Sequence, residues 1–389
     1  MRGACLFRLD RTRLLCLVLF CNACGLGAFG PLLPEIGRTQ SLADWQLGLV
    51  AAAFGFARMV AAMPTGLLVA RRLAASLMTA PVVIVVGLAF LLGAGPFPLL
   101  LAGRFLLGVA QTLTMIGGLT VILVDDHGPN ASVRLNLFEF SGMLGVLGGL
   151  GLVAVVPSAW GWKASLLIGS TPVLVSLLLI PAMARVFPKA LVHERPDASL
   201  PLERAPARRG SRGVVALMFG AGIVFALSWS AVSGFVVPIR GTREFGLSRT
   251  GISWLLAMAQ VIDLAFLLPV GRAADRMGRR VVLGAVTVVL GLGTIGVGLG
   301  SFPWFAAGCA CFGFGLAGWM LPLGVIREHT PVARLAWRTG LYRVGVDSAI
   351  FLGPLVAGIV GRNGEGIFLA LIGVAAMALG ARLLWRPSL

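Results

Sequence analysis

The feature that most constrains this chain is a succession of apolar runs, each about as long as a bilayer is thick. A helix needs roughly 20 apolar residues to cross the hydrocarbon core, and runs of that length recur along almost the whole sequence. The runs do not alternate apolar and polar residues, which excludes the strands of a membrane β-barrel. At 58% hydrophobic residues, the chain is also too apolar for an ordinary water-soluble domain. The sequence therefore predicts an all-α polytopic membrane protein.

Hydropathy predicts twelve transmembrane helices with short connections. Their expected ranges are 14–34, 46–69, 76–94, 99–124, 135–157, 163–184, 214–238, 249–270, 281–300, 304–326, 339–360 and 366–386.

The charges of the chain predict its orientation in the membrane. With an inner N-terminus, few of the 32 Lys and Arg residues fall in outer loops. Those few are Arg38, Lys163, Arg240, Arg243, Arg249 and Arg362. Because cationic loops stay on the cytoplasmic side, we expect both termini to be cytoplasmic. The net charge of +17 then reflects topology, and we expect no nucleic-acid partner.

The longest polar stretch, residues 188–213, is rich in Pro, Arg and small residues and has no apolar periodicity. Such composition is typical of a linker. It predicts an N-terminal six-helix bundle over 1–187, a cytoplasmic linker over 188–213, and a C-terminal six-helix bundle over 214–389.

The two halves resemble each other at a nearly constant offset. The segment from Pro64 matches the one from Pro269, and the segment from Phe97 matches the one from Phe302, both at an offset of 205. Parallel six-helix repeats imply two bundles related by a pseudo-twofold axis along the membrane normal. The substrate site of such a protein is expected between the bundles, near the midplane.

A charged loop in the second half carries a family motif. The stretch "GRAADRMGRR", 271–280, satisfies every position of G-x-x-x-D-R-x-G-R-R, and "GPLLPEI", "GRFLLG" and "GPLVAG" occur elsewhere. In these residues the chain resembles the major facilitator superfamily (MFS) of transporters. The first-half copy of the loop, "GLLVARRLAA", keeps Gly66 and Arg71 but has Ala70 in the acidic position.

The resemblance implies that the loop of the second half is a cytoplasmic gate, which latches the two bundles together when the transporter is open to the outside. Its candidate residues are Gly271, Asp275, Arg276, Gly278, Arg279 and Arg280. From the residues alone, Gly278 supports a tight turn, and Asp275 can cap a helix or pair with an arginine. The alternative is that the loop serves only to hold its side of the protein in the cytoplasm.

Six ionisable residues fall within predicted spans, where unpaired charge is costly. They are Arg58, Arg104, Glu139, Asp263, Arg343 and Asp347. In the resembled fold the second helix packs on the eleventh and the fifth on the eighth. That packing predicts an Arg58–Asp347 ion pair, which Arg343 can contest from the same helix face, and a carboxylate pair of Asp263 with Glu139 that could bind a proton. Static ion pairing without proton movement is the alternative.

Arg104 matches an R-x-x-x-G element of the fourth helix, which the resemblance links to proton coupling. Binding of an anionic substrate and structural pairing are the two alternatives for this arginine. Polar residues that could line a cavity are Gln111, Thr114, Asn136, Trp229 and Gln260. Each of them could equally form only an interhelical hydrogen bond.

We therefore expect a secondary transporter that moves a small organic solute by alternating access, coupled to protons, with the direction open. An uncoupled facilitator and a non-transporting receptor or assembly protein are the alternatives. No nucleotide-binding loop and no metal-ligand spacing occurs, so neither an enzyme nor a cofactor is expected. We expect a monomer in the bilayer of a bacterial inner membrane.

Overall fold

The computed structural model describes residues 10–93, 96–125, 131–187, 211–330 and 332–385, and these residues form helices and no strand. The N-terminal part contains α1 (Arg11–Phe29), η1 (Gly30–Leu32), α2 (Leu33–Thr39), α3 (Asp44–Leu92), α4 (Phe97–Asp125), α5 (Ala131–Val155), η2 (Ser158–Trp160), α6 (Gly161–Gly169), α7 (Pro172–Leu178) and α8 (Ile180–Val186). The C-terminal part contains α9 (Ser211–Ala231), η3 (Val232–Val236), α10 (Val237–Arg243), α11 (Arg249–Met277), α12 (Arg279–Gly298), α13 (Phe302–Leu316), α14 (Leu321–Glu328) and α15 (Val332–Trp385).

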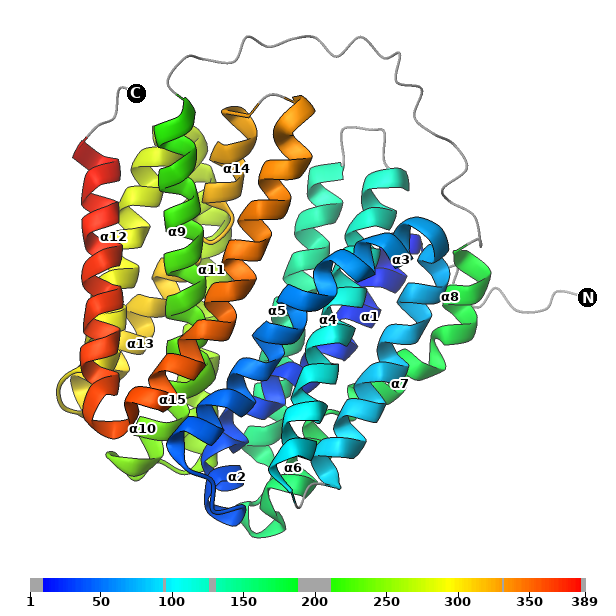
Figure 1. The fold of residues 1–389 in the computed structure, drawn as a ribbon, viewed down its shortest axis with the longest axis vertical. Coiled ribbons are helices and arrows are strands. Elements are labelled where there is room, and N and C mark those ends of the chain that lie inside the picture. The colour runs from blue at the N-terminus through cyan, green and yellow to red at the C-terminus, as the bar shows by residue number, and fades with distance from the viewer. Residues whose placement is uncertain (1–9, 94–95, 126–130, 188–210, 331, 386–389) are drawn as a thin grey trace, which may run out of the picture.

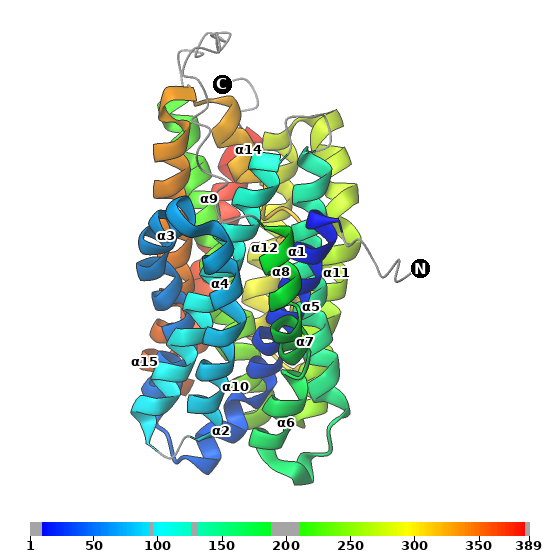
Figure 2. The same ribbon diagram turned by 90° about the vertical axis from the view of Figure 1, so that its right-hand side faces the viewer.

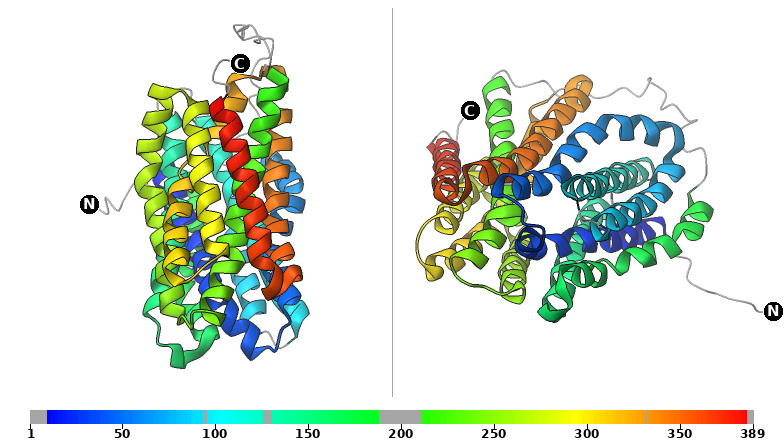
Figure 3. Two further views of the ribbon diagram at one scale, coloured as in Figure 1. Left: turned by 90° about the vertical axis from the view of Figure 1, so that its left-hand side faces the viewer. Right: turned by 60° about the horizontal axis from the view of Figure 1, so that its bottom comes forward.

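These elements form two helical bundles that lie side by side, α1 to α8 in one and α9 to α15 in the other (Figure 1). We call them the first and second halves. In the first half α1 packs on α5, as Figure 2 shows. In the second half α9, α12 and the last part of α15 lie together (Figure 3, left). The expected linker over 188–213 lies almost wholly outside the described residues.

Ten helical segments within the described residues are long and apolar enough to cross a membrane. Two of them contain 49 residues each, α3 and the segment Trp337–Trp385 of α15. Each has a break in its helical backbone, at Arg72 (φ −146°, ψ 61°) in α3 and at Gly361 (φ 59°, ψ −165°) in α15. The chain reverses direction within both of these helices (Figure 1). The twelve predicted spans therefore do not correspond to twelve separate helices. Two helices, α3 and α15, each contain two predicted spans, one on either side of the break.

The breaks, together with the helix directions, define two ends of the molecule. At the linker end α8 ends, α9 begins and α3 breaks at Arg72. At the opposite end, which we call the far end, α3 and α11 begin and α15 breaks at Gly361. Gly361 suits its position because its positive φ is strained for residues with a side chain.

The largest contacts between the halves are those of two helix pairs, α3 with α15 and α5 with α11. Near the far end the backbones of α3 and α15 nearly touch, since a Cβ added to Gly48 would lie 2.6 Å from the Pro354 carbonyl oxygen. A Cβ on Gly358 would lie 2.7 Å from the Cα of Gly48. From this crossing the two helices diverge toward the linker end (Figure 1). The halves are therefore packed most tightly at the far end.

Candidate functional site

A central pocket lies between the two halves and takes its wall from both. The lining residues of the first half are Leu26, Gly27, Phe29, Gly30, Ala51, Phe54, Arg104, Val146 and Leu150. Those of the second half are Trp229, Ser230, Ser233, Gly234, Leu256, Gln260, Ile350 and Pro354. The predicted residues Arg104, Trp229 and Gln260 therefore lie in one site. Ser233 and Gly234 reach it through η3, a single turn of π-helix, and such turns often occur at functional sites.

Among the described residues, Arg104 is the one charged residue in the wall of this pocket. Its side chain projects from α4, is 7% exposed, and stacks on the Phe29 ring with its guanidinium carbon 3.9 Å from the ring centroid. The Phe54 ring lies 5.0 Å from the same carbon. The buried atoms Nε and Nη1 have no hydrogen-bond partner in the part of the chain that the structure describes. The aromatic faces stabilise the cation in part, but they leave these two nitrogen atoms without a hydrogen bond.

Asp263 lies one helical turn from Gln260 on α11 and is 4% exposed. Its Oδ2 accepts a hydrogen bond from Gln260 Nε2 at 3.1 Å, and its buried Oδ1 has no hydrogen-bond partner among the described residues. The expected pairing of Asp263 with Glu139 stays a prediction: the described contact of Asp263 is with Gln260, and the arginines nearest in effect to Glu139 are Arg58 and Arg343. Thr250 of α11 donates to the carbonyl of Ala154 in α5, and Asp263 and Glu139 lie 13 and 15 positions from that contact along antiparallel helices, so the two carboxylates stand at nearly the same depth.

Arg58 and Asp347 form an ion pair across the two halves, at 2.8 Å between Nη2 and Oδ1. Their side chains are 13% and 2% exposed. Both residues lie 14 positions from the far-end limit of their helix segments, Asp44 and Gly361, and therefore at the same depth. Arg343 contacts the same carboxylate from one turn away, at 3.5 Å. The predicted contact between Arg58 and Asp347 is therefore found, and Arg343 contacts the same carboxylate.

The far end carries ion pairs that the sequence did not predict. Arg249 Nε and Nη2 donate to the two oxygens of Glu35 at 2.8 and 2.7 Å, and Arg249 Nη1 donates to Ser165 Oγ. Arg243 pairs with Asp44 at 2.5 Å. Both pairs join the second half to the first. The sequence indicated both arginines only as cations of outer loops, although Glu35 stands in the "GPLLPEI" motif.

The loop that carries the family motif lies at the linker end, and the two ion pairs of its Arg279 stay within the second half. Gly278 (φ 95°) separates α11 from α12, which is the tight turn that was predicted. Arg279 pairs with Glu328 at 2.8 Å and, more loosely, with Asp275 at 3.8 Å. Asp275 is 72% exposed, and Gly271 and Arg276 lie on the last turns of α11.

Three of the predicted cavity residues lie outside the wall of the central pocket. The hydroxyl of Thr114 accepts a hydrogen bond from Asn22 at 3.1 Å, so this residue joins helices in the core of the first half. Asn136 is exposed near the linker end of α5, and Gln111 is half-buried on α4. Thr114 therefore forms an interhelical hydrogen bond and does not line the central pocket.

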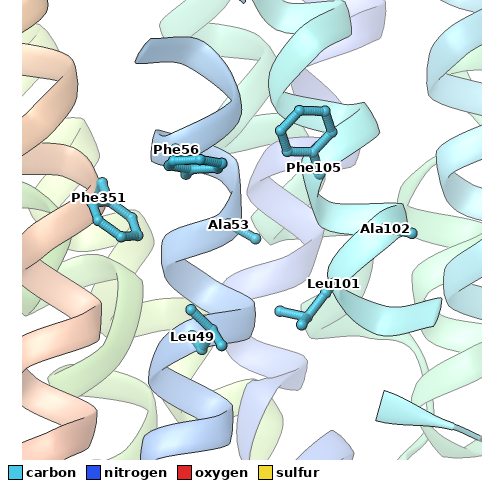
Figure 4. Close-up of a pocket in the computed structure, with 7 residues that line it drawn as sticks. All are labelled: Leu49, Ala53, Phe56, Leu101, Ala102, Phe105 and Phe351. Atoms are coloured by element: carbon cyan, nitrogen blue, oxygen red, sulfur yellow. The ribbon is translucent and has the colours of Figure 1, made fainter. Parts of the chain in front are cut away.

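A second recess lies between α3, α4 and α15, and it is wholly apolar (Figure 4). Phe56 lies between Phe105 and Phe351, with ring centroids 6.2 and 5.4 Å from its own. Leu49, Ala53, Leu101 and Ala102 complete the wall. A site without polar groups cannot orient a polar solute, so the central pocket is the candidate substrate site.

Many membrane-crossing helices in two bundles, with a mixed polar and apolar pocket between them, define an integral membrane protein of the secondary-transporter class. The chain belongs to the Major Facilitator Superfamily, whose family model matches residues 15–236 and 218–388.

Solved transporter structures share the fold at low sequence identity. A mutant form of the nucleoside transporter NupG is 13% identical with a TM-score of 0.76, and the match covers 97% of this chain and 100% of that one. A POT family transporter in complex with 5-aminolevulinic acid is 13% identical with a TM-score of 0.78, covering 96% and 95%. The peptide transporter POT in complex with sulfate is 12% identical with a TM-score of 0.78, covering 97% and 94%.

Proposed function

We propose that this protein is a proton-coupled secondary transporter that carries a small organic solute by alternating access. The observation that carries the proposal is the central pocket, which both halves line and which contains a buried arginine with two nitrogen atoms that lack a hydrogen-bond partner among the described residues. A site shared by two rigid halves changes its access when the halves rock about it. Transport is the activity of the family to which the chain belongs.

The proposal includes twelve crossings in two six-helix bundles related by a pseudo-twofold axis. A helix of 49 residues would be about 74 Å long, more than twice the roughly 30 Å of the hydrocarbon core. The breaks at Arg72 and Gly361 divide α3 and α15 into two spans each. We place the linker end in the cytoplasm of a bacterial cell because cationic residues gather there, and we propose that the monomer is the transporting unit.

In this orientation the structure is closed toward the outside and its halves diverge toward the cytoplasm. We propose Asp263 as the proton site, since its carboxyl group is buried, lacks a described partner for one oxygen, and is joined to the pocket by Gln260. Arg58, Asp347 and Arg343 then form the ion pair that links the halves, with Glu139 beside them. The loop residues Asp275, Arg276, Arg279 and Arg280 latch the halves in the opposite state.

The test uses purified protein in proteoliposomes, with a panel of labelled organic acids, amines and neutral solutes and an imposed pH gradient. We expect wild-type protein to accumulate at least one solute against its concentration gradient. The variant Asp263→Asn should lose accumulation but keep exchange of the same solute, since exchange needs no net proton movement. Asp10→Asn, which changes an exposed carboxylate at the start of α1, is the matched control.

Other outcomes decide between the remaining functions. Full accumulation by Asp263→Asn would remove this residue as the proton site. Flux that equilibrates without responding to the pH gradient would identify an uncoupled facilitator. Absence of flux for the whole panel would favour a receptor or assembly protein with a transporter fold.

A further inference from the structure

The wall of the central pocket carries information about the charge of its ligand. Among the described residues its charge comes from Arg104 alone, and its other polar side chains are neutral: Ser230, Ser233 and Gln260. The described ion pairs of the protein involve other arginines. A buried cation without a counterion is costly. An anionic ligand would remove that cost on binding.

The geometry of Arg104 also indicates where the anion binds. The residue is more than nine-tenths buried, and its Nε and Nη1 atoms have no hydrogen-bond partner among the described residues. Phe29 covers one face of the guanidinium plane at 3.9 Å, which leaves the edge with its nitrogen atoms for hydrogen bonding. A carboxylate matches the fork of donors on that edge with two parallel bonds.

The remaining wall is apolar and partly aromatic. Phe29, Phe54 and Trp229 supply rings, and aliphatic residues such as Leu150 and Leu256 surround them. Such a wall stabilises the apolar body of a ligand, while a single cation balances a single negative charge. A ligand with two or three negative charges would leave charge uncompensated in a site with one arginine.

We propose that the substrate of this pocket is a monoanionic organic acid, whose carboxylate pairs with Arg104 and whose apolar or aromatic body packs against Phe29, Phe54 and Trp229. The inference rests on the proposed transport function and adds a class of substrate to it. Gln260 connects this anion site to Asp263, so a proton and an anion bound together would cross without net charge.

Equilibrium binding to the detergent-purified full chain tests the inference without any transport assay. The probes are benzoate, its neutral counterpart benzamide, the cation benzylammonium, the dianion phenylphosphonate at pH 8.5, and acetate, which lacks the apolar body. Thermal stabilisation and the quenching of tryptophan fluorescence report binding. We expect benzoate to bind at least about tenfold more tightly than each of the other four probes, since a hydrogen bond to a charged group contributes that much.

Variants locate the binding to Arg104. In Arg104→Gln the preference for benzoate over benzamide should disappear, and in Arg104→Lys it should persist in weaker form because the charge remains and the fork is lost. Arg382→Gln removes an exposed cation at the end of α15 and should bind as wild type does. If Arg104→Gln does not fold, the probe series on wild-type protein decides the question.

The inference is overturned if benzamide or benzylammonium binds as tightly as benzoate, if phenylphosphonate binds more tightly, if none of the carboxylates binds, or if Arg104→Gln keeps the preference. These results differ from a failure of the proposed function. Carboxylate binding at Arg104 without flux would contradict transport alone, whereas flux of a cation or neutral solute with Arg104→Gln unaffected would contradict the anion site alone.

Discussion

The two ends of the molecule use their charges differently. At the far end Arg249 and Arg243 of the second half reach across to Glu35 and Asp44 of the first. At the linker end Arg279 pairs with Glu328 and Asp275, both within its own half. These described charges therefore fasten the halves to each other at one end and stay within one half at the other. If the protein opens at the far end, the ion pairs between the halves at that end have to break, and new contacts between the halves have to form at the linker end.

Of the far-end contacts, we expect the Glu35–Arg249 pair to have the largest effect. The Arg249 side chain is 1% exposed and makes two hydrogen bonds to one carboxylate. In Arg249→Gln the Glu35 carboxylate loses its partner, and loss of one member of a buried pair costs about 3 to 5 kcal/mol. We expect the far-end closed state to lose most of that stabilisation, so that the far end opens.

This opening can be measured in a cysteine-free background with Leu256→Cys, a pocket residue that is 8% exposed. An impermeant maleimide applied from the far side should label it at least about tenfold faster in Arg249→Gln, since tenfold needs only about 1.4 kcal/mol. Arg362→Gln, which removes an exposed far-end cation, serves as the control. Equal labelling in wild type and Arg249→Gln would show that the pair does not hold this end closed.

We expect a smaller effect from the ion pair at mid-depth. In Arg58→Gln the Asp347 carboxylate keeps Arg343 at 3.5 Å, so we expect a loss of about 2 kcal/mol, less than the roughly 3 to 5 kcal/mol for a buried acid that loses its sole partner. In Arg58→Gln with Arg343→Gln the acid has neither partner and the loss should be clearly greater than the sum of the single losses. Thermal unfolding in detergent measures both. Simple additivity would contradict the sharing of Asp347 by two arginines.

The smallest effect on stability is expected at the linker end. Asp275 is 72% exposed and 3.8 Å from Arg279, so Asp275→Asn should change the free energy of unfolding by about 0.5 kcal/mol or less. It should nevertheless slow transport, because we propose that this residue acts in the state that is closed at the linker end. Wild-type transport rates in Asp275→Asn would show that the loop has no part in gating.

The sequence was most informative where the repeat could be combined with helix packing. Arg58 and Asp347 stand at corresponding depths, and their ion pair followed from the family resemblance. The same reasoning placed Asp263 and Glu139 at corresponding depths on α11 and α5, but it did not predict that Asp263 bonds to Gln260 on its own helix, because that contact depends on side-chain packing.

The far-end pairs could not be predicted because Glu35 and Arg249 stand at helix ends outside the repeated segments, and their contact depends on how the halves close. The sequence also could not predict which of the twelve expected spans belong to one continuous helix. Hydropathy located the spans, but whether a turn such as that at Arg72 interrupts the helix depends on local backbone geometry. The stacking of Arg104 on Phe29 likewise depends on packing between α4 and α1, for which the sequence carried no signal.

The central claim is that the two ends open in alternation about the central pocket, and electron–electron distance measurements test it most directly. One spin-label pair at exposed far-end sites, Arg38 and Arg362, and another at exposed linker-end sites, Arg71 and Met277, would be measured with and without Arg249→Gln. We predict that this substitution lengthens the far-end distance and shortens the linker-end distance. Unchanged distances, or distances that lengthen at both ends together, would contradict alternating access in this protein.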